Sequence, residues 1–301
     1  MKFMVEYPIQ SDVDGGAWLD PANIAAFART AEEAGLSAIA VTDHPAPSKK
    51  WLDNGGHETF DPFVALGFWA AATSRIRLMT YLAVVPYRNP LLLAKSMTSV
   101  DVLSGGRATF VLGAGYLRSE FAALGVDFAE RNELFDESVE VLRGIWSTDE
   151  FSHQGKHFSS RGQIIKPGPV QLPHPPLWLG GNAAVVRERV AAWGQGWAPL
   201  QGSAQLSQTT RTPGIESEDD LVAMLDDLDE RLAAHGRSRS DIDVCAKVGA
   251  RWTDGSDAYL EALAGLSKLG VTWTSVPVVL DSFAAALEGL QRFGVDVIAK
   301  H

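Results

Sequence analysis

The feature that most constrains the fold is a repeated alternation of short apolar runs with helix-forming segments along the chain. Phe3–Tyr7 and Leu36–Thr42 are predicted strands, and the second is apolar enough to be covered on both faces. Pro21–Ala34 between them is a predicted helix, with Asp20 as its N-cap and Gly35 at its end. About eight such units follow one another, which is what a (β/α)8 barrel requires. We therefore predict an α/β fold of the (β/α)8 TIM-barrel type.

A doubly wound open sheet is the main alternative to a barrel, because it also alternates strands with helices. No GxGxxG motif follows the first predicted strand, which argues against a dinucleotide-binding sheet of that kind. The alternation breaks between Thr148 and Pro176, where period-two pieces and several prolines predict an inserted hairpin and loop. We expect a single domain over residues 1–301 with an insertion at about 148–176.

The charge balance and the cysteine count exclude several classes of protein. The 26 Lys and Arg residues against 37 Asp and Glu residues give a formal net charge of −11, which disfavours nucleic acid as a partner. The single Cys245 cannot form an internal disulfide, and Met1–Pro8 lacks the apolar core of a signal peptide. Pro62–Ser74, the longest uncharged apolar stretch, is too short to span a bilayer. We expect a cytoplasmic protein that acts on a small-molecule substrate and binds neither nucleic acid nor a membrane.

Ligands of such barrels lie at the carboxyl ends of the strands, so polar residues and glycines at these places are the candidate site residues. Asp43 and His44 follow the second predicted strand, and a histidine there can exchange protons near neutral pH. Glycines allow a ligand to approach the backbone, and the amides at a helix start attract phosphate. The other candidates are Thr80, Tyr81, Gly113, Gly115, Tyr116, Gly180, Gly181, Asn182 and Trp197. Each position also has an ordinary interpretation as a turn or as core packing.

A metal centre is a weaker alternative, because His57 and Glu58 lie in the same predicted loop as Asp43 and His44, namely Asp43–Phe60. Their spacing matches no standard ligand motif, so we predict no metal site. GxSxG, HExxH and P-loop motifs are also absent from the sequence.

The mouth loops Pro45–Phe60 and Gln201–Glu216 are expected to set specificity, and Trp51, His57 and Phe60 in the first of them predict a partly aromatic pocket wall. Gln201–Glu216 is polar and is predicted to be a mobile loop at the barrel mouth. His153, His157 and His174 lie in the insertion and are expected at the surface.

Taken in order, these motifs resemble one family. The chain has a strand-end Asp43-His44, then TYLAVVPYRNPLLLAKSMTSVDVLSGGRATFVLGAGYLRSEFAALGV, then PVQLPHPPLWLGGNAAVVRERVAAWGQGWAPL. This order resembles the luciferase-like monooxygenase superfamily, and within it the oxidoreductases that depend on the deazaflavin coenzyme F420. The resemblance runs from Met1 to about Leu200 and is strongest over Arg75–Val126. Its motifs are less specific for the cofactor, because members that use FMN share the scaffold.

The resemblance implies a barrel whose flavin or deazaflavin ring lies at the carboxyl-terminal mouth. It also implies a non-proline cis peptide between Tyr81 and Leu82 behind the ring, and a phosphate-binding turn at Gly180, Gly181 and Asn182. The full set of cofactor-binding positions that it implies is Asp43, Thr80, Tyr81, Leu82, Gly113, Gly115, Gly180, Gly181 and Asn182.

Two positions depart from the well-understood deazaflavin dehydrogenases of the family. Tyr116 stands where some of them carry a glutamate proton donor, and Ser48 aligns near a tryptophan that follows their Asp-His pair. These departures argue against sugar-phosphate dehydrogenase chemistry.

The resulting hypothesis is an oxidoreductase that transfers a hydride between coenzyme F420 and a small organic substrate. His44 is the expected proton-handling residue, Asp43 is expected to orient the ring or to hydrogen-bond its edge, and Tyr116 is a second catalytic candidate. The basic residues considered for the cofactor tail are Lys49, Lys50, Arg88, Lys95 and Arg187. A homodimer through the apolar helices Asp61–Thr73 and Leu91–Leu103 is also expected. An FMN-dependent monooxygenase that uses reduced flavin and O2, and a non-catalytic barrel that binds flavin or deazaflavin, are the alternatives.

Overall fold

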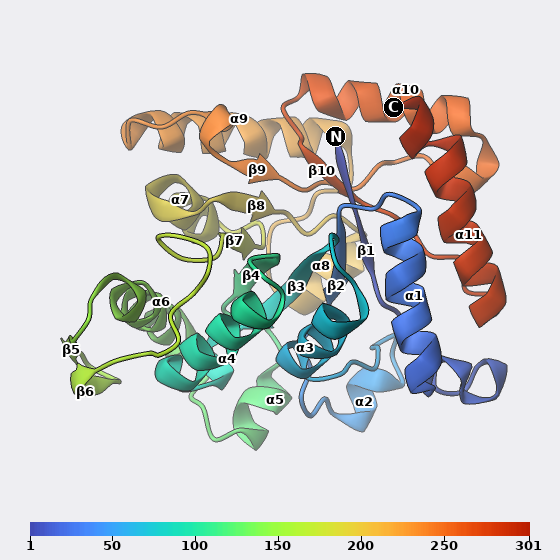
Figure 1. Cartoon of the computed structure of the whole chain (residues 1–301). Helices are drawn as coiled ribbons and strands as arrows, with labels where there is room; N and C mark the ends of the chain where they lie inside the picture. Colours follow the sequence, from blue (N-terminus) through green and yellow to red (C-terminus); the bar gives the residue numbers. More distant parts are fainter. The chain divides into compact units, whose positions relative to one another are not determined.

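The computed structural model describes residues 1–301, with the single exception of the side chain of Leu206. Strands and helices alternate along most of the chain, as predicted (Figure 1). The strands are β1 (Lys2–Glu6), β2 (Ala38–Val41), β3 (Arg77–Val84), β4 (Ala108–Gly113), β5 (Phe151–Gln154), β6 (Ser159–Gln163), β7 (Leu177–Gly180), β8 (Gly196–Ala198), β9 (Asp243–Val244) and β10 (Trp273–Ser275). The α-helices are α1 (Pro21–Glu33), α2 (Lys49–Leu52), α3 (Pro62–Ala72), α4 (Pro90–Leu103), α5 (Arg118–Ala123), α6 (Arg131–Ser147), α7 (Ala184–Trp193), α8 (Ala204–Thr210), α9 (Glu218–Ala234), α10 (Ser256–Lys268) and α11 (Phe283–Asp296).

Eight of the strands form one sheet, in the order β10-β1-β2-β3-β4-β7-β8-β9. The pairs β1–β10, β1–β2, β3–β4, β7–β8 and β8–β9 are parallel. The two ends of this order meet, because Cys245 next to β9 forms a parallel bridge with Trp273 of β10. The Ala246 N–H donates to the Trp273 carbonyl at 3.0 Å beside that bridge. The strands follow one another in chain order, without the reversal that defines a doubly wound sheet, so the predicted (β/α)8 barrel is confirmed.

The residues divide into two compact units. Unit 1 comprises Met1–Ala40, Arg75–Arg77 and Leu177–His301, and unit 2 comprises Val41–Ser74 and Leu78–Pro176. The single domain expected over the whole chain stays a prediction. No helix in the part of the chain that the structure describes combines the length and the apolar character needed to cross a membrane.

In unit 2, helices α3 and α4 begin where the sequence predicts, since each has a capping side chain and a proline in its first turn. The Asp61 carboxylate accepts a hydrogen bond from the Phe63 amide at 3.0 Å, and Asn89 caps α4 in the same way. On the outer face of these helices, Val64 is 71% exposed and Leu92 is 70% exposed. The homodimer through these helices stays a prediction.

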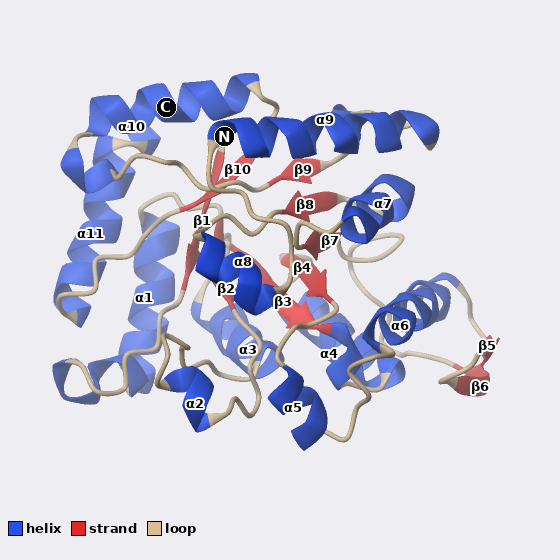
Figure 2. Ribbon diagram, turned by 180° about the vertical axis from the view of Figure 1, so that it is seen from behind, coloured by secondary structure: helices blue, strands red, loops and turns tan.

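The predicted inserted hairpin is present in unit 2, where β5 and β6 pair antiparallel. Figure 2 shows it beside α6 and apart from β3 and β4. The expectation that the histidines of this region lie at the surface is wrong, because glutamates of α6 and its N-cap cover His153 and His157, and His174 is buried against the backbone. The His153 and His157 side chains are only 9% and 11% exposed, and His153 Nε2 lies 3.2 Å from Glu137 Oε1. His174 is also buried, and its Nδ1–H donates to the next carbonyl along the chain.

The segment Gln201–Glu216, expected to be a loop, contains helix α8. Both ends of the segment are fastened by one buried side chain in unit 1. The Asn182 amide group donates to the carbonyls of Leu200 and Pro213, at 2.7 Å each. The polar sequence of this segment does not show that the distant Asn182 side chain binds the backbone at two places around it.

Two other segments also differ from expectation. The predicted loop Asp43–Phe60 contains the short helix α2, because the Ser48 hydroxyl accepts a hydrogen bond from the Trp51 amide at 3.3 Å. The strand expected over Ile242–Gly249 is reduced to β9 and the single bridge at Cys245.

In unit 1, an ion-pair network joins α7 to α9. The Arg187 side chain is mostly buried, pairs with Asp227 through Nε, and donates to the Asn182 carbonyl at 2.5 Å. Arg231 also donates to the Asp227 carboxylate, at 2.8 Å. The hydrogen bonds from Arg231 and Arg187 lower the pKa of Asp227 to about 2.

We predict that Asp227→Asn destabilises the protein at pH 7 by about 1–3 kcal/mol, because Arg187 loses its charged acceptor. The pKa of Asp227 is lower in the folded chain than its ordinary value of 3.8, so the unfolded chain takes up the proton first as the pH falls. The stabilisation is therefore present above pH 4 and is lost between pH 4 and pH 2. Urea unfolding across this range measures the effect, with the exposed neighbour Asp226→Asn as the control. Equal stability of Asp227→Asn and the wild type at pH 7 would contradict it.

Candidate active site

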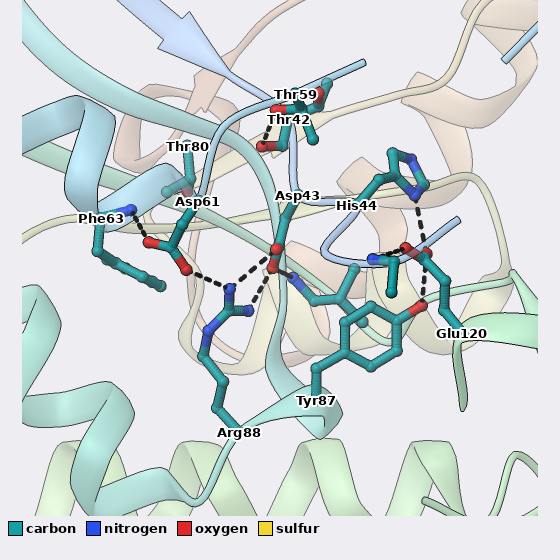
Figure 3. A network of polar contacts seen from close by, with 12 residues as sticks. Thr42, Asp43, His44, Thr59, Asp61, Phe63, Thr80, Tyr87, Arg88 and Glu120 are labelled. Atoms are coloured by element: carbon teal, nitrogen blue, oxygen red, sulfur yellow. Dashed lines mark hydrogen bonds and ion pairs between the residues drawn. The ribbon is translucent and has the colours of Figure 1, made fainter. Parts of the chain in front are cut away.

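Asp43, directly after β2, is held by an arginine on the segment that follows β3 (Figure 3). Its Oδ2 accepts from Arg88 Nη1 at 2.5 Å and from the Val84 amide at 2.9 Å, and its Oδ1 accepts from Arg88 Nη2 at 2.9 Å. Arg88 also donates to Asp61, the N-cap of α3, at 3.1 Å. The Asp43 side chain is 1% exposed, so this bidentate pair fixes the ends of β2 and β3 rather than leaving a free carboxylate.

His44 is held by a second carboxylate, which sequence reasoning did not single out. Its Nδ1 lies 2.9 Å from Oε2 of Glu120, a fully buried residue on α5. The same carboxylate accepts from the Ala46 amide at 3.1 Å and from the Tyr87 hydroxyl at 3.1 Å. Figure 3 shows the His44 and Tyr87 side chains pointing toward this one carboxylate. Nothing in the sequence distinguishes Glu120 from the other acidic residues on helices.

Aromatic rings surround the His44 imidazole on its other sides. The ring centroids of Trp51, His57 and Tyr116 lie 4.5, 5.1 and 5.9 Å from that of His44. Burial raises the pKa of Tyr116 to about 12, against a smaller opposing effect of its hydrogen bond with Trp51. Tyr116 therefore keeps its proton near neutral pH and can donate it in a hydrogen bond.

Trp51, which the sequence predicts in a partly aromatic pocket wall, lies against His44. Ser48 caps α2, and one turn later this helix places the Trp51 indole against the His44 ring at an interplanar angle of 39°. A tryptophan therefore contacts His44 in this chain although position 48 is a serine.

The peptide bond between Tyr81 and Leu82 is cis, as the resemblance implies. Thr80 before it is fully buried, and its hydroxyl donates to the Val111 carbonyl at 2.9 Å. At Gly113 on β4, a Cβ would lie 2.5 Å from Leu82 Cδ1, so any side chain there would displace the Leu82 side chain of β3.

Gly115 is required by its backbone conformation as well as by its neighbours. Its φ is +78°, and a Cβ would lie 2.6 Å from the Val84 side chain and 2.9 Å from that of Phe121. The structure therefore explains both glycines by packing, and a cofactor-facing role for them stays a prediction.

The turn predicted to bind phosphate lies in unit 1, after β7. The backbone N–H of Gly181 donates to the Ala198 carbonyl at 3.1 Å, and the backbone N–H of Asn182 donates to Thr212 Oγ1 at 3.1 Å. Helix α7 starts next, and its N-cap Ala183 provides no side-chain hydrogen bond to the first turn. The first-turn amides of α7 are thus the donors that fit a phosphate group best, just beyond the predicted turn.

Gly181 leaves room for a close approach to the backbone at this turn. Gly180 is the last residue of β7, and Gly181 has a φ of +116°. A Cβ at Gly181 would meet only Val186 Cγ2, at 3.7 Å. The local geometry of unit 1 is therefore compatible with a phosphorylated cofactor.

Four of the five basic residues considered for the cofactor tail, all except Lys50, make side-chain contacts within the protein. Arg88 and Arg187 form the ion pairs described above. Lys49 pairs with Asp53 on the surface, and Lys95 donates to the Lys166 carbonyl. None of these contacts singles out a tail-binding cation.

The alternative metal centre in the Asp43–Phe60 loop is not assembled. Among the residues that the structure describes, the one group of His, Cys, Asp or Glu with three close ligand atoms is Glu130, Glu133 and His157. The Lys156 ammonium already bonds both of these carboxylates, at 3.0 and 2.6 Å. A metal ion there would have to displace a cation of the protein itself.

Comparison with known proteins relates this chain to enzymes that use two different cofactors. An FMNH(2)-dependent dimethylsulfone monooxygenase of Pseudomonas putida is 29% identical over 187 residues, which are 61% of this chain and 47% of that protein. An F420-dependent glucose-6-phosphate dehydrogenase of Gordonia bronchialis is 28% identical over 206 residues, 65% of this chain and 58% of that protein. The matches thus span about half the length of these relatives.

The fold agrees with that of a solved monooxygenase structure. Monooxygenase RslO1 from Streptomyces bottropensis superposes with a TM-score of 0.81 at 20% sequence identity, over 100% of this chain and 99% of that one. The sequence model described as "Luciferase-like monooxygenase" matches residues 1–296, nearly the whole chain. The chain therefore belongs to the luciferase-like monooxygenase family.

Proposed function

We propose that this chain is an oxidoreductase that transfers a hydride between coenzyme F420 and a small, uncharged organic substrate. The observation that carries the proposal is the His44 imidazole, held at the end of β2 by buried Glu120 and enclosed by Trp51 and Tyr116. A histidine held in this way is suited to exchange a proton near neutral pH. The similarity to an F420-dependent dehydrogenase supports the choice of cofactor.

In this proposal the deazaflavin, when bound, accepts or returns the hydride, and side chains of the protein handle the proton. His44 accepts the hydroxyl proton of a substrate that is being oxidised, or returns it in the reverse direction. Tyr116, protonated near neutral pH, hydrogen-bonds the substrate oxygen. Asp43, whose two oxygens are engaged by Arg88, is a positioning residue.

The proposed cofactor-binding residues keep the positions that the resemblance implies. In unit 2 they are Asp43, Thr80, Tyr81, Leu82, Gly113 and Gly115. In unit 1 they are Gly180, Gly181 and Asn182, with the uncapped first turn of α7 as the phosphate-binding element.

The charges around His44 favour a substrate without a phosphate group. Three carboxylates, those of Asp43, Asp61 and Glu120, lie in the polar network near His44, against the single guanidinium of Arg88. This acidic excess repels an anionic substrate, and the nearby aromatic rings offer apolar contact instead.

The second candidate is an FMN-dependent monooxygenase that uses reduced flavin and O2. The similarity to the Pseudomonas putida protein, which is named as FMNH(2)-dependent, favours this candidate.

The proposal also includes a homodimer, a cytoplasmic location and the absence of nucleic-acid and membrane partners.

The first test is a titration of the purified protein with F420 and with FMN, followed by absorbance. We expect tight binding of F420 and reduction of the bound cofactor by members of a panel of neutral alcohols. FMN binding together with substrate-dependent consumption of O2 would instead support the monooxygenase. Tight binding of either cofactor without turnover across the panel would support a non-catalytic binding protein.

The second test is His44→Gln, which removes the proposed proton acceptor while conserving a polar side chain. We expect the turnover number with F420 to fall about 10²–10⁴-fold, with little change in the dissociation constant of the cofactor. The matched control is His235→Gln, because His235 also pairs with a glutamate, Glu188, but lies at the surface directly after α9. Unchanged turnover in His44→Gln would contradict the assignment.

A further inference from the structure

We propose that Glu120 is a positioning residue that fixes the tautomer of His44, so that Nδ1 always carries a proton and Nε2 alone exchanges protons with the substrate. The proposal rests on the oxidoreductase function proposed above, because it specifies which atom of His44 does the work. Its structural core, the tautomer, can be measured without cofactor or substrate.

The first step concerns the two groups other than His44 that bond Glu120. The Ala46 backbone N–H can only donate, and it reaches Oε1 at 3.1 Å. The Tyr87 hydroxyl reaches Oε2 at 3.1 Å, and burial together with Glu120 raises the pKa of Tyr87 far above its ordinary value. Tyr87 therefore keeps its proton and donates. Both oxygens of Glu120 thus act as acceptors, as in an ionised carboxylate.

The second step concerns the contact with His44. Oε2 of Glu120 lies 2.9 Å from Nδ1, inside a site where the glutamate is fully buried. If Nδ1 were unprotonated, two lone pairs would face each other without water to screen them, which is costly in a buried site. The contact therefore selects the protonated Nδ1, in neutral imidazole and in imidazolium alike.

The third step concerns the opposite nitrogen. In the part of the chain that the structure describes, Nε2 of His44 makes no hydrogen bond, while the rings of Trp51, His57 and Tyr116 pack around the imidazole. The lone pair of the neutral ring is consequently on Nε2. The proton that His44 takes up or gives away passes through this atom.

A single isosteric change should reverse this arrangement. In Glu120→Gln, the amide oxygen can keep the bond from the Ala46 N–H, which places the NH2 group where Oε2 faces His44. The NH2 group can only donate, so Nδ1 must become the acceptor and the proton must move to Nε2. The Tyr87 hydroxyl can turn to accept from the same NH2 group, so the shape of the site is retained.

The experiment is ¹⁵N NMR of histidine-labelled protein without cofactor, at a pH where the imidazoles are neutral, with the His44 signals assigned by His44→Gln. In the wild type we expect a protonated Nδ1 and an unprotonated Nε2. In Glu120→Gln we expect the reverse. In the control Glu188→Gln, which alters the surface pair with His235, we expect the His44 signals of the wild type. A purely structural role of Glu120 would not invert the tautomer.

Activity is the second readout, and it separates this proposal from the proposed function. If the enzyme works with F420, Glu120→Gln should lower turnover about 10²–10⁴-fold, as an incorrect tautomer does, with the cofactor dissociation constant almost unchanged. A wild type with its proton on Nε2 would overturn the proposal whatever the activity. If the NMR spectra show the predicted tautomers but the protein is inactive with F420, the proposed function is wrong and the role of Glu120 in fixing the tautomer still holds. If Glu120→Gln does not fold, the wild-type spectrum alone decides the tautomer.

Discussion

The candidate active site depends on the placement of one buried charge. Glu120 has no exposed surface, and a carboxylate in such a place is tolerated only when donors surround it. The donors come from the segment after β2, through His44 and Ala46, and from the segment after β3, through Tyr87. Its hydrogen bonds therefore fasten α5 to both of these segments. The Asp43–Arg88 pair ties the same two segments together a few residues away.

Much of the fold could be predicted from the sequence because local signals specify it. Asp61-Pro62 and Asn89-Pro90 start α3 and α4, and the capping box of Ser217 with Asp220 starts α9. Apolar runs between the helices predicted parallel strands, and the order of the strands confirms the barrel. These signals act over a few residues, so a single sequence contains them in full.

The parts that could not be predicted depend on contacts between distant residues. Glu120 lies 76 positions from His44, and its charge gives no sign of burial or of its partner. Trp51 is predicted in an aromatic pocket wall, but its contact with the His44 ring depends on the short helix that Ser48 caps. The burial of His153 and His157 in the hairpin could not be predicted, because the glutamates that cover them come from α6 and its N-cap. The hydrogen bonds from Asn182 to the carbonyls of Leu200 and Pro213, on either side of α8, likewise join residues far apart in the chain.

Membership of the luciferase-like monooxygenase family narrows the chemistry to flavin and deazaflavin reactions, while the residues of this chain suggest how the proton is handled. The most direct measurement is a crystal structure with F420 and an unreactive analogue of a neutral alcohol. The account predicts the analogue's oxygen within about 2.6–3.2 Å of His44 Nε2, with Nδ1 still on Glu120. An analogue oxygen held elsewhere, with the imidazole turned away from it, would contradict the account.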